Sequence, residues 1–123
     1  MATVASVLKA INKNPIAFIR RFWPGAEPWQ EKVIELLWSY SRVAVVSCNG
    51  AGKTWLVGRA VVTWLLGNPG SVVVTTAGTW AQVRNQVWKE INSAHARLPE
   101  WLQMGKPCKV TSWHLTAGWY AVG

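Results

Sequence analysis

The chain has 123 residues, half of them hydrophobic, which is enough for at most one domain with a buried core and excludes an intrinsically disordered protein. Thirteen lysines and arginines oppose five acidic residues, so the formal net charge is +8 and a polyanion such as DNA or RNA is a suitable partner. The two cysteines, Cys48 and Cys108, are too few for a disulfide framework or a cysteine-based metal site, and we expect a reducing compartment.

Three helices are predicted in the first 40 residues. The first rests on apolar residues that recur at helical spacing from Val4 to Ile11. Asn14 followed by Pro15 is typical of an N-cap and the first position of a second helix, which the Trp-Pro-Gly sequence at 23–25 ends. A third helix begins at Pro28, and its apolar stripe consists of Trp29, Val33, Leu36, Leu37 and Tyr40.

A strand–helix–strand unit is predicted in the middle of the chain. The apolar run Val43–Val46 is its first strand, and the β-branched segment Ser71–Thr75 is its second. Between them, the segment from Trp55 to Leu66 is apolar almost all round, which is typical of a helix buried on several sides. The Gly-Asn-Pro-Gly sequence at 67–70 ends this helix. Such a unit normally contains parallel strands with a right-handed crossover.

One further helix and two further strands complete the prediction. The helix is indicated by a stripe at steps of three and four residues, namely Trp80, Val83, Val87, Ile91 and Ala94, and it ends before Pro99. The strands are Cys108–Trp113 and Trp119–Val122, joined by a turn around Ala117-Gly118. Most of the ten tryptophans are expected to fill the core and interfaces, with a minority available to stack on bases or adenine.

The sequence from Ser47 to Thr54, which reads Ser-Cys-Asn-Gly-Ala-Gly-Lys-Thr, lies between the first predicted strand and the long apolar helix. This is the context that a phosphate-binding P-loop requires. Consecutive backbone N–H groups in such a loop, together with the positive end of the helix, form an anion site. The expected phosphate-binding residues are Ser47, Asn49, Gly50, Ala51, Gly52, Lys53 and Thr54.

Each residue type in this loop has a physical reason. Gly50 and Gly52 allow a tight bend and a close approach of the backbone to phosphate oxygens. Lys53 brings a compact positive charge to the β- and γ-phosphates, and the Thr54 hydroxyl is a ligand for Mg²⁺. The usual motif begins with glycine, and here that position is Ser47. The motif predicts ATP with Mg²⁺ as the ligand, and the alternative is a chance glycine-containing turn that caps an ordinary helix.

Several segments together resemble the large subunit of tailed-phage terminases, the ATPases that package DNA. These segments are Pro28-Trp29-Gln30, the loop from Val46 to Trp55, Val73 to Ala77, Trp80 and Gln82-Val83. The resemblance runs from about Asn14 to the end of the chain. The loop is shared with many NTPases. The upstream glutamine and the downstream Thr-Thr-Ala and Gln-Val segments make the resemblance to terminases more specific.

The resemblance implies roles for individual residues. Gln30 would read the adenine, with Trp29 nearby; the alternative is an ordinary polar residue on a helix face. Thr75, Thr76 and Thr79 would lie in the segment that couples the nucleotide state to DNA, and their alternative roles are a strand end and an N-cap. Many terminases carry an arginine in the loop, at the place that Asn49 occupies here, so an arginine acting from this loop is in doubt.

The resemblance also implies a fold and a domain organisation. We expect an α/β fold of the P-loop NTPase type, with a mostly parallel sheet flanked by helices. Residues 1–123 would form a single partial ATPase domain, with a helical N-terminal segment at 1–40 and an α/β core fragment at 43–123. The last residues read like a strand in an incomplete sheet, so the chain is expected to be a fragment or the product of a truncated gene.

The residues that hydrolysis requires are missing from this sequence. Hydrolysis of ATP needs an Asp at a strand end for the magnesium shell and a Glu that activates water. The chain contains no aspartate, and none of its glutamates (Glu27, Glu31, Glu35, Glu90 and Glu100) follows an apolar strand. We therefore expect the chain to bind ATP and Mg²⁺ without turnover. The alternatives are a non-catalytic nucleotide- or DNA-binding remnant and a fragment of another nucleic-acid motor such as a helicase.

Expected partners follow from the charge and from the resemblance. Double-stranded DNA suits the positive charge, although the basic residues are scattered, and a solvated basic surface without such a partner is the alternative. The resemblance adds the terminase small subunit, the portal, a homo-oligomer and a location in the host cytoplasm, at the procapsid. No membrane segment is expected, because the apolar run from Trp55 to Leu66 is too short to span a bilayer and contains Arg59.

Overall fold

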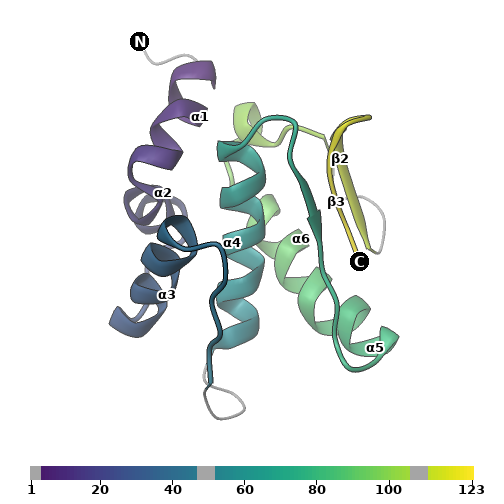
Figure 1. The fold of residues 1–123 in the computed structure, drawn as a ribbon. Helices are drawn as coiled ribbons and strands as arrows, with labels where there is room; N and C mark the ends of the chain where they lie inside the picture. Colours follow the sequence, from purple (N-terminus) through teal and green to yellow (C-terminus); the bar gives the residue numbers. More distant parts are fainter. Residues whose placement is uncertain (1–3, 47–51, 106–110) are drawn as a thin grey trace.

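The computed structural model describes residues 4–46, 52–105 and 111–123. Helix α4 (Lys53–Gly67) runs through the middle of the molecule (Figure 1). Helices α1 (Val4–Lys13), α2 (Pro15–Phe22) and α3 (Pro28–Ser39) lie on one side of it. Helix α6 (Trp88–Ala96) and a small sheet lie on the other side.

The first three helices confirm the sequence prediction. The Asn14 side chain accepts a hydrogen bond from the Ala17 N–H at 3.1 Å, and Pro15 occupies the first turn of α2. The predicted stripe of α3 is wrong in part, because the fully buried residues of this helix are Gln30 and Ile34, whereas Tyr40 is 65% exposed. The other four predicted members, Trp29, Val33, Leu36 and Leu37, are partly buried, so the stripe is wrong at Tyr40 and omits Gln30 and Ile34.

Helix α4 is buried on most of its surface, as its apolar sequence predicts. Nine of its residues are buried, namely Leu56, Gly58, Arg59, Val61, Val62, Thr63, Leu65, Leu66 and Gly67. Gly58 lets α4 approach α6 closely, because a Cβ there would lie 2.8 Å from the Glu90 carbonyl carbon. At the other end of α4, the Asn12 side chain donates a hydrogen bond to the Gly67 carbonyl at 2.7 Å and thereby ties α1 to this helix.

The predicted helix after residue 80 is helical throughout but not uniform. A short α5 (Trp80–Gln82) leads into a π-helical turn (Val83–Val87), which continues into α6. A 3₁₀ turn (Glu100–Leu102) follows Pro99. Of the predicted stripe, Val83, Ile91 and Ala94 are buried, Val87 is partly buried and Trp80 is 56% exposed.

The sheet has three strands in the order β1-β3-β2. Strand β1 (Val72–Val74) pairs in parallel with β3 (Trp119–Val122), and β2 (Ser112–Thr116) pairs antiparallel with β3. Strand β1 and the β2–β3 hairpin confirm three of the predicted strands in position, with β2 ending three residues later than predicted. Residues 108–110 of the predicted strand lie outside the described residues.

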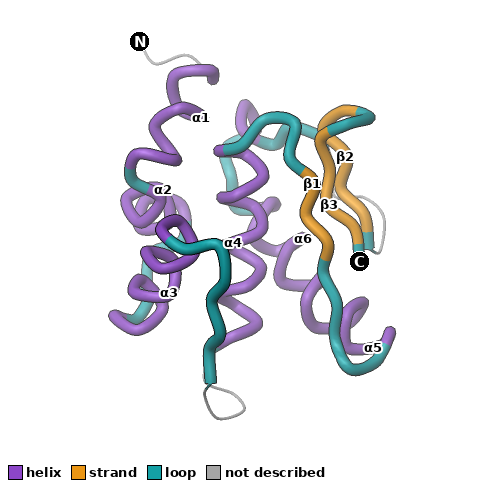
Figure 2. The backbone as a smooth tube through the Cα atoms, in the orientation of Figure 1, coloured by secondary structure: helices purple, strands orange, loops and turns teal. Residues whose placement is uncertain are grey.

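The predicted fold class is wrong. Val43–Val46 is extended chain rather than a strand, and Val46 is 98% exposed (Figure 2). The strand–helix–strand unit around α4 is therefore not formed, and the described residues make a largely helical structure with a small mixed sheet. A short apolar run becomes a strand only when another strand lies beside it to accept and donate backbone hydrogen bonds, and the sheet of this structure contains no neighbour for Val43–Val46 in the part of the chain described.

Four tryptophans are buried, and each indole N–H has a partner. Trp23 donates to the carbonyl of Ala94, and Trp119 donates to that of Leu65. The other two are Trp88, which donates to Thr75 Oγ1 at 2.9 Å, and Trp113, which donates to the carbonyls of Met104 and Gly105. A buried indole without a partner would be costly, so these five hydrogen bonds fix how the helices and the hairpin pack. The prediction that tryptophan fills the core is confirmed for these residues.

Candidate functional site

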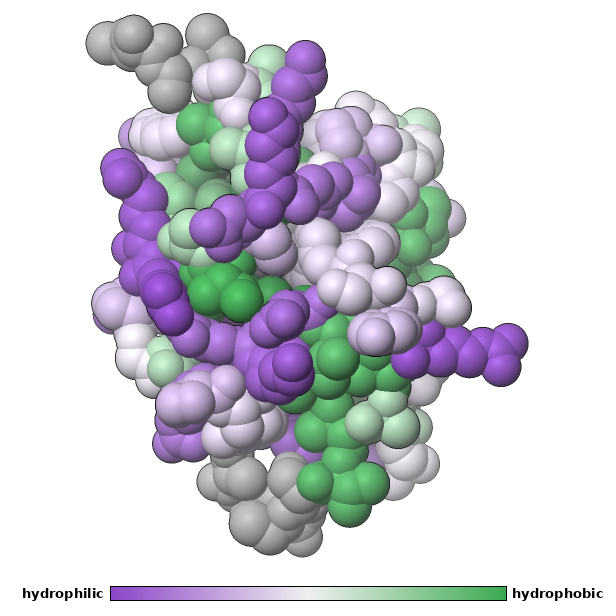
Figure 3. All heavy atoms as spheres, turned by 60° about the vertical axis from the view of Figure 1, so that its left-hand side comes forward, coloured by the Kyte–Doolittle hydropathy of each residue, from purple (hydrophilic) through white to green (hydrophobic). Residues whose placement is uncertain are grey.

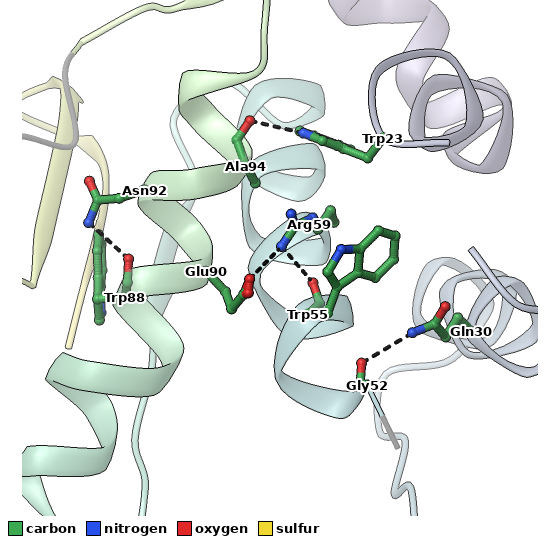
Figure 4. A network of polar contacts seen from close by, with 9 residues as sticks. All are labelled: Trp23, Gln30, Gly52, Trp55, Arg59, Trp88, Glu90, Asn92 and Ala94. Carbon is green, nitrogen blue, oxygen red and sulfur yellow. Dashed lines mark hydrogen bonds and ion pairs between the residues drawn. The ribbon is translucent and has the colours of Figure 1, made fainter. Parts of the chain in front are cut away.

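The predicted phosphate-binding residues fall partly within the described structure. Gly52, Lys53 and Thr54 are described, as are Gln30 and Trp29 on α3. The remaining predicted residues, Ser47, Asn49, Gly50 and Ala51, lie outside the described residues. The structure brings Gln30 next to Gly52, although the two are far apart in the sequence (Figure 4). Trp29 also lies close to Gly52.

Gly52 is the N-cap of α4 and has a left-handed backbone conformation with φ of +92°. A Cβ at this position would lie 2.8 Å from Gln30 Nε2 and 3.9 Å from Trp29 Cζ2. Glycine is thus required at position 52 for two reasons, namely the left-handed backbone angle and the close approach of α3.

Lys53 and Thr54 occupy the first two positions of α4, and both are half-buried. Gly52 has no side chain with which to cap the first-turn N–H groups of this helix. These N–H groups and the helix dipole favour an anion at this end of α4. The backbone therefore fits a phosphate group, and the Thr54 hydroxyl is an oxygen donor of the kind that Mg²⁺ accepts beside phosphate oxygens and water.

The Gln30 amide links α3 to this helix terminus. Its Oε1 accepts a hydrogen bond from the Glu27 N–H at 2.8 Å, and its Nε2 donates to the Gly52 carbonyl at 3.2 Å (Figure 4). The same carbonyl accepts the first bond of α4, from the Leu56 N–H. An amide can make up to four hydrogen bonds, and contacts among the described residues account for two of those of Gln30, which is 5% exposed. The adenine role stays a prediction.

Trp29 is held beside Gly52 by a carboxylate. Its indole N–H donates to Glu27 Oε2 at 2.6 Å, and its ring is half-buried. Glu27 thus positions both neighbours of Gly52, since its backbone N–H also holds Gln30.

A buried ion pair lies behind the first turn of α4, and the sequence did not predict it. Arg59 is only 3% exposed, and its Nη1 lies 3.1 Å from Glu90 Oε1 on α6 (Figure 4). Its guanidinium also stacks on Trp55, at 4.5 Å from the ring centroid. Burial lowers the pKa of Arg59, and the Glu90 carboxylate opposes this shift. An arginine in an otherwise apolar helix was the available sequence signal, but nothing local indicates its partner 31 residues away.

The three threonines that the resemblance singles out occupy different environments. Thr75 is buried and joins the Trp88 indole to the Val122 carbonyl through its hydroxyl. Thr76 is exposed. Thr79 is the N-cap of α5, where its hydroxyl accepts from the Gln82 N–H at 3.1 Å. For Thr79 the structure thus shows the alternative role of an N-cap.

Among the described residues, no group of three or more histidines, cysteines or acidic residues could hold a metal ion. Three of the glutamates form ion pairs: Glu31 with Arg20, Glu35 with Lys32, and Glu90 with Arg59. A carboxylate pair of the kind that binds the magnesium shell and activates water is thus not present in the part of the chain described here.

A separate hollow lies on the face formed by α1 and α2. It has a volume of about 830 Å³ and is lined mainly by apolar side chains, with Phe18, Phe22 and Trp101 as its aromatic members. On this face long hydrophilic side chains border apolar surface (Figure 3). Of the described phosphate-site residues, Gly52, Lys53 and Thr54 do not line this hollow.

No helix in the described residues is long and apolar enough to cross a membrane. Comparisons with protein-family models, with curated proteins and with solved structures each found no match to this chain. The residues around Gly52 and their geometry are therefore the basis for a functional proposal.

Proposed function

We propose that the chain binds Mg-ATP at the N-terminal end of α4, as the nucleotide-binding part of a DNA-packaging ATPase of the terminase type, and does not hydrolyse it alone. One observation carries the proposal. Gly52, with φ of +92°, is held by the Gln30 amide directly before Lys53 and Thr54, which open α4. A glycine with a left-handed backbone, a lysine and a hydroxyl at a helix N-terminus form the combination that binds a triphosphate with magnesium.

Each residue of the site would contact a different part of Mg-ATP. Backbone N–H groups of the first turn of α4 would donate hydrogen bonds to the phosphate oxygens, and Lys53 would neutralise their charge. Thr54 would hold the magnesium ion, which neutralises further phosphate charge when it is bound. Trp29 and Gln30 lie on the same side of Gly52 and would meet the base.

Titration with Mg-ATP tests this proposal. Calorimetry on the folded chain should give weak binding, and Lys53→Ala should abolish it because the side-chain charge is lost. Lys32→Ala is a matched control, since it removes one exposed lysine of α3, whose ion-pair partner among the described residues is Glu35, one turn further along the same helix. Binding that survives Lys53→Ala, or no binding at millimolar nucleotide by a folded chain, would contradict the proposal.

A second proposed partner is double-stranded DNA, which the charge of +8 favours. Among the described residues, ion pairs with glutamates neutralise Arg20, Lys32 and Arg59, and Arg59 is buried. Affinity for a DNA duplex should fall steeply as salt rises, because binding releases counterions from the phosphates. Salt-independent binding would contradict a phosphate contact. The terminase small subunit and the portal are proposed partners on the resemblance alone.

A further inference from the structure

The Arg59 guanidinium uses only some of its hydrogen-bond donors in the described structure. Its Nη1 donates to Glu90 Oε1 at 3.1 Å and to the Trp55 carbonyl at 3.4 Å, and its Nε is buried with no hydrogen-bond partner in the described structure. A buried donor without a partner is costly. The Nε–H side of this guanidinium therefore carries positive charge that no acceptor in the described structure offsets.

The position of that charge relative to α4 follows from helix geometry. Side chains in a helix lean towards the N-terminus, and Arg59 accordingly reaches the carbonyl of Trp55, one turn earlier. Trp55 directly follows Lys53 and Thr54 in the sequence. The guanidinium therefore lies alongside the first turn, about one turn or roughly 5 Å along the axis from the helix terminus.

We propose that Arg59 and Glu90 form an electrostatic tuning pair for the phosphate site: buried Arg59 attracts the triphosphate from behind the first turn of α4, and Glu90 offsets that attraction. The inference rests on the proposed function. Arg59 does not touch the nucleotide in this arrangement, so it is a positioning and electrostatic residue. The pair sets how tightly the site holds an anion.

Because Arg59 and Glu90 are largely shielded from solvent, their effect on nucleotide affinity should be measurable. Solvent screens exposed charges strongly, whereas Arg59 is 3% exposed and the Glu90 side chain only 25% exposed. With an effective dielectric constant of about 20, a unit charge at about 10 Å changes the affinity on the order of tenfold for each net negative charge of the bound nucleotide, before screening by salt. We therefore expect shifts of about three- to tenfold.

Removing the negative charge and removing the positive charge of the pair should shift the affinity for Mg-ATP in opposite directions. If the pair had only a structural role, both substitutions would be expected to shift it in the same direction. Glu90→Gln keeps the shape and a hydrogen-bond acceptor but leaves the Arg59 charge without its counter-charge, so the affinity for Mg-ATP should rise by about three- to tenfold. Arg59→Met removes the cation and should lower the affinity by a similar factor. Both substitutions break a buried ion pair and should lower the melting temperature.

Two controls separate this effect from the fold and from net charge. Arg59→Lys retains the charge, so its affinity should stay within about twofold of the unchanged chain. Glu35→Gln and Lys32→Met make the same charge changes at an exposed ion pair of α3, and they should leave the affinity unchanged because solvent screens them.

The decisive measurement is the Mg-ATP dissociation constant from calorimetry, beside a thermal melt of each variant. A rise in affinity for Glu90→Gln supports the pair. Unchanged or weaker binding by folded Glu90→Gln overturns it, even where Arg59→Met does not fold. If the folded chain binds no Mg-ATP at all, the proposed function and this inference both fail. If Lys53-dependent binding is present but both substitutions weaken it, only this inference fails.

Discussion

The Gln30 Nε2 atom donates a hydrogen bond to the Gly52 carbonyl oxygen at 3.2 Å, across 22 residues of sequence. The carbonyl belongs to the N-cap of α4, and the donor belongs to the first turn of α3. Two helix N-termini are thereby fixed to one another by a single amide. The arrangement holds the predicted phosphate end of α4 in place.

Gly52→Ala is expected to destabilise the fold more than an ordinary glycine substitution. The left-handed backbone angle costs an alanine about 1–2 kcal/mol, and the new Cβ would also lie 2.8 Å from Gln30 Nε2. Gly25→Ala is the matched control, because Gly25 has φ of +108° and nothing within 4 Å of its Cβ position. Urea unfolding should show a larger loss for Gly52→Ala, and equal losses would contradict a close contact with Gln30.

Gln30→Ala should weaken both the fold and nucleotide binding. It removes two hydrogen bonds, each worth about 0.5–1.5 kcal/mol, so the free energy of unfolding should fall by about 1–3 kcal/mol. Nucleotide affinity should fall several-fold because Gly52 loses its tether. Gln86→Ala, at an exposed position of the π-helical turn, is the control and should change neither quantity. A loss of stability with unchanged affinity would show that the tether does not serve the site.

Local signals predicted the parts of this fold that depend on neighbouring residues. The Asn14-Pro15 pair marks the boundary between α1 and α2 because the cap hydrogen bond joins residues three apart. The Ala117-Gly118 turn marks the β2–β3 hairpin for the same reason. Val43–Val46 has an equally strong strand sequence, yet whether it becomes a strand depends on a neighbour that no local pattern specifies.

For the candidate site too, local sequence signals indicate some residues, whereas contacts that depend on helix packing are not visible in the sequence. The loop motif predicts Lys53 and Thr54 as phosphate-site residues from spacing within eight residues, and their role in binding stays a prediction. The resemblance assigned Gln30 to the same ligand, and the structure brings its amide to Gly52. Arg59 was seen in the sequence only as an interruption of an apolar helix. Its pairing with Glu90 depends on how α4 packs on α6, which sequence spacing does not reveal.

The Trp88–Thr75 hydrogen bond should contribute measurably to stability. Trp88 is fully buried, and its indole N–H donates to Thr75 Oγ1 at 2.9 Å. Thr75→Val should lower the free energy of unfolding by about 1–3 kcal/mol, because it leaves a buried donor unsatisfied. A double-mutant cycle with Trp88→Phe should return a coupling energy of about 1 kcal/mol. Additive losses would mean that the hydroxyl and the indole act independently.

Stability should fall in mildly acidic solution because of His95. Burial lowers the pKa of its imidazole below the ordinary value of 6.5, and the carbonyls of Gly105 and Met104 only partly oppose this shift. The unfolded chain then binds more protons than the folded one at a pH between the lowered value and 6.5, so the free energy of unfolding is greatest above 6.5 and decreases as the pH falls below it.

His95→Leu should flatten this pH dependence. Denaturant unfolding of the variant between about pH 5.5 and pH 7.5 should give a nearly constant free energy, because the titrating group is absent. His114→Gln, at an exposed position of β2, should retain the slope of the unchanged chain. An equally steep dependence in His95→Leu would assign the effect to other groups.

The purified chain should show no ATP hydrolysis. Turnover needs a carboxylate for the magnesium shell and a second one to activate water, and the sequence has no aspartate at all. Of the glutamates, Glu90 is the one whose partner lies on α4, and it is engaged by Arg59. Phosphate release at saturating Mg-ATP should therefore match that of Lys53→Ala, which lacks the loop lysine. Steady release that Lys53→Ala abolishes would contradict this prediction and would mean that a carboxylate paired in this structure is freed to act on water.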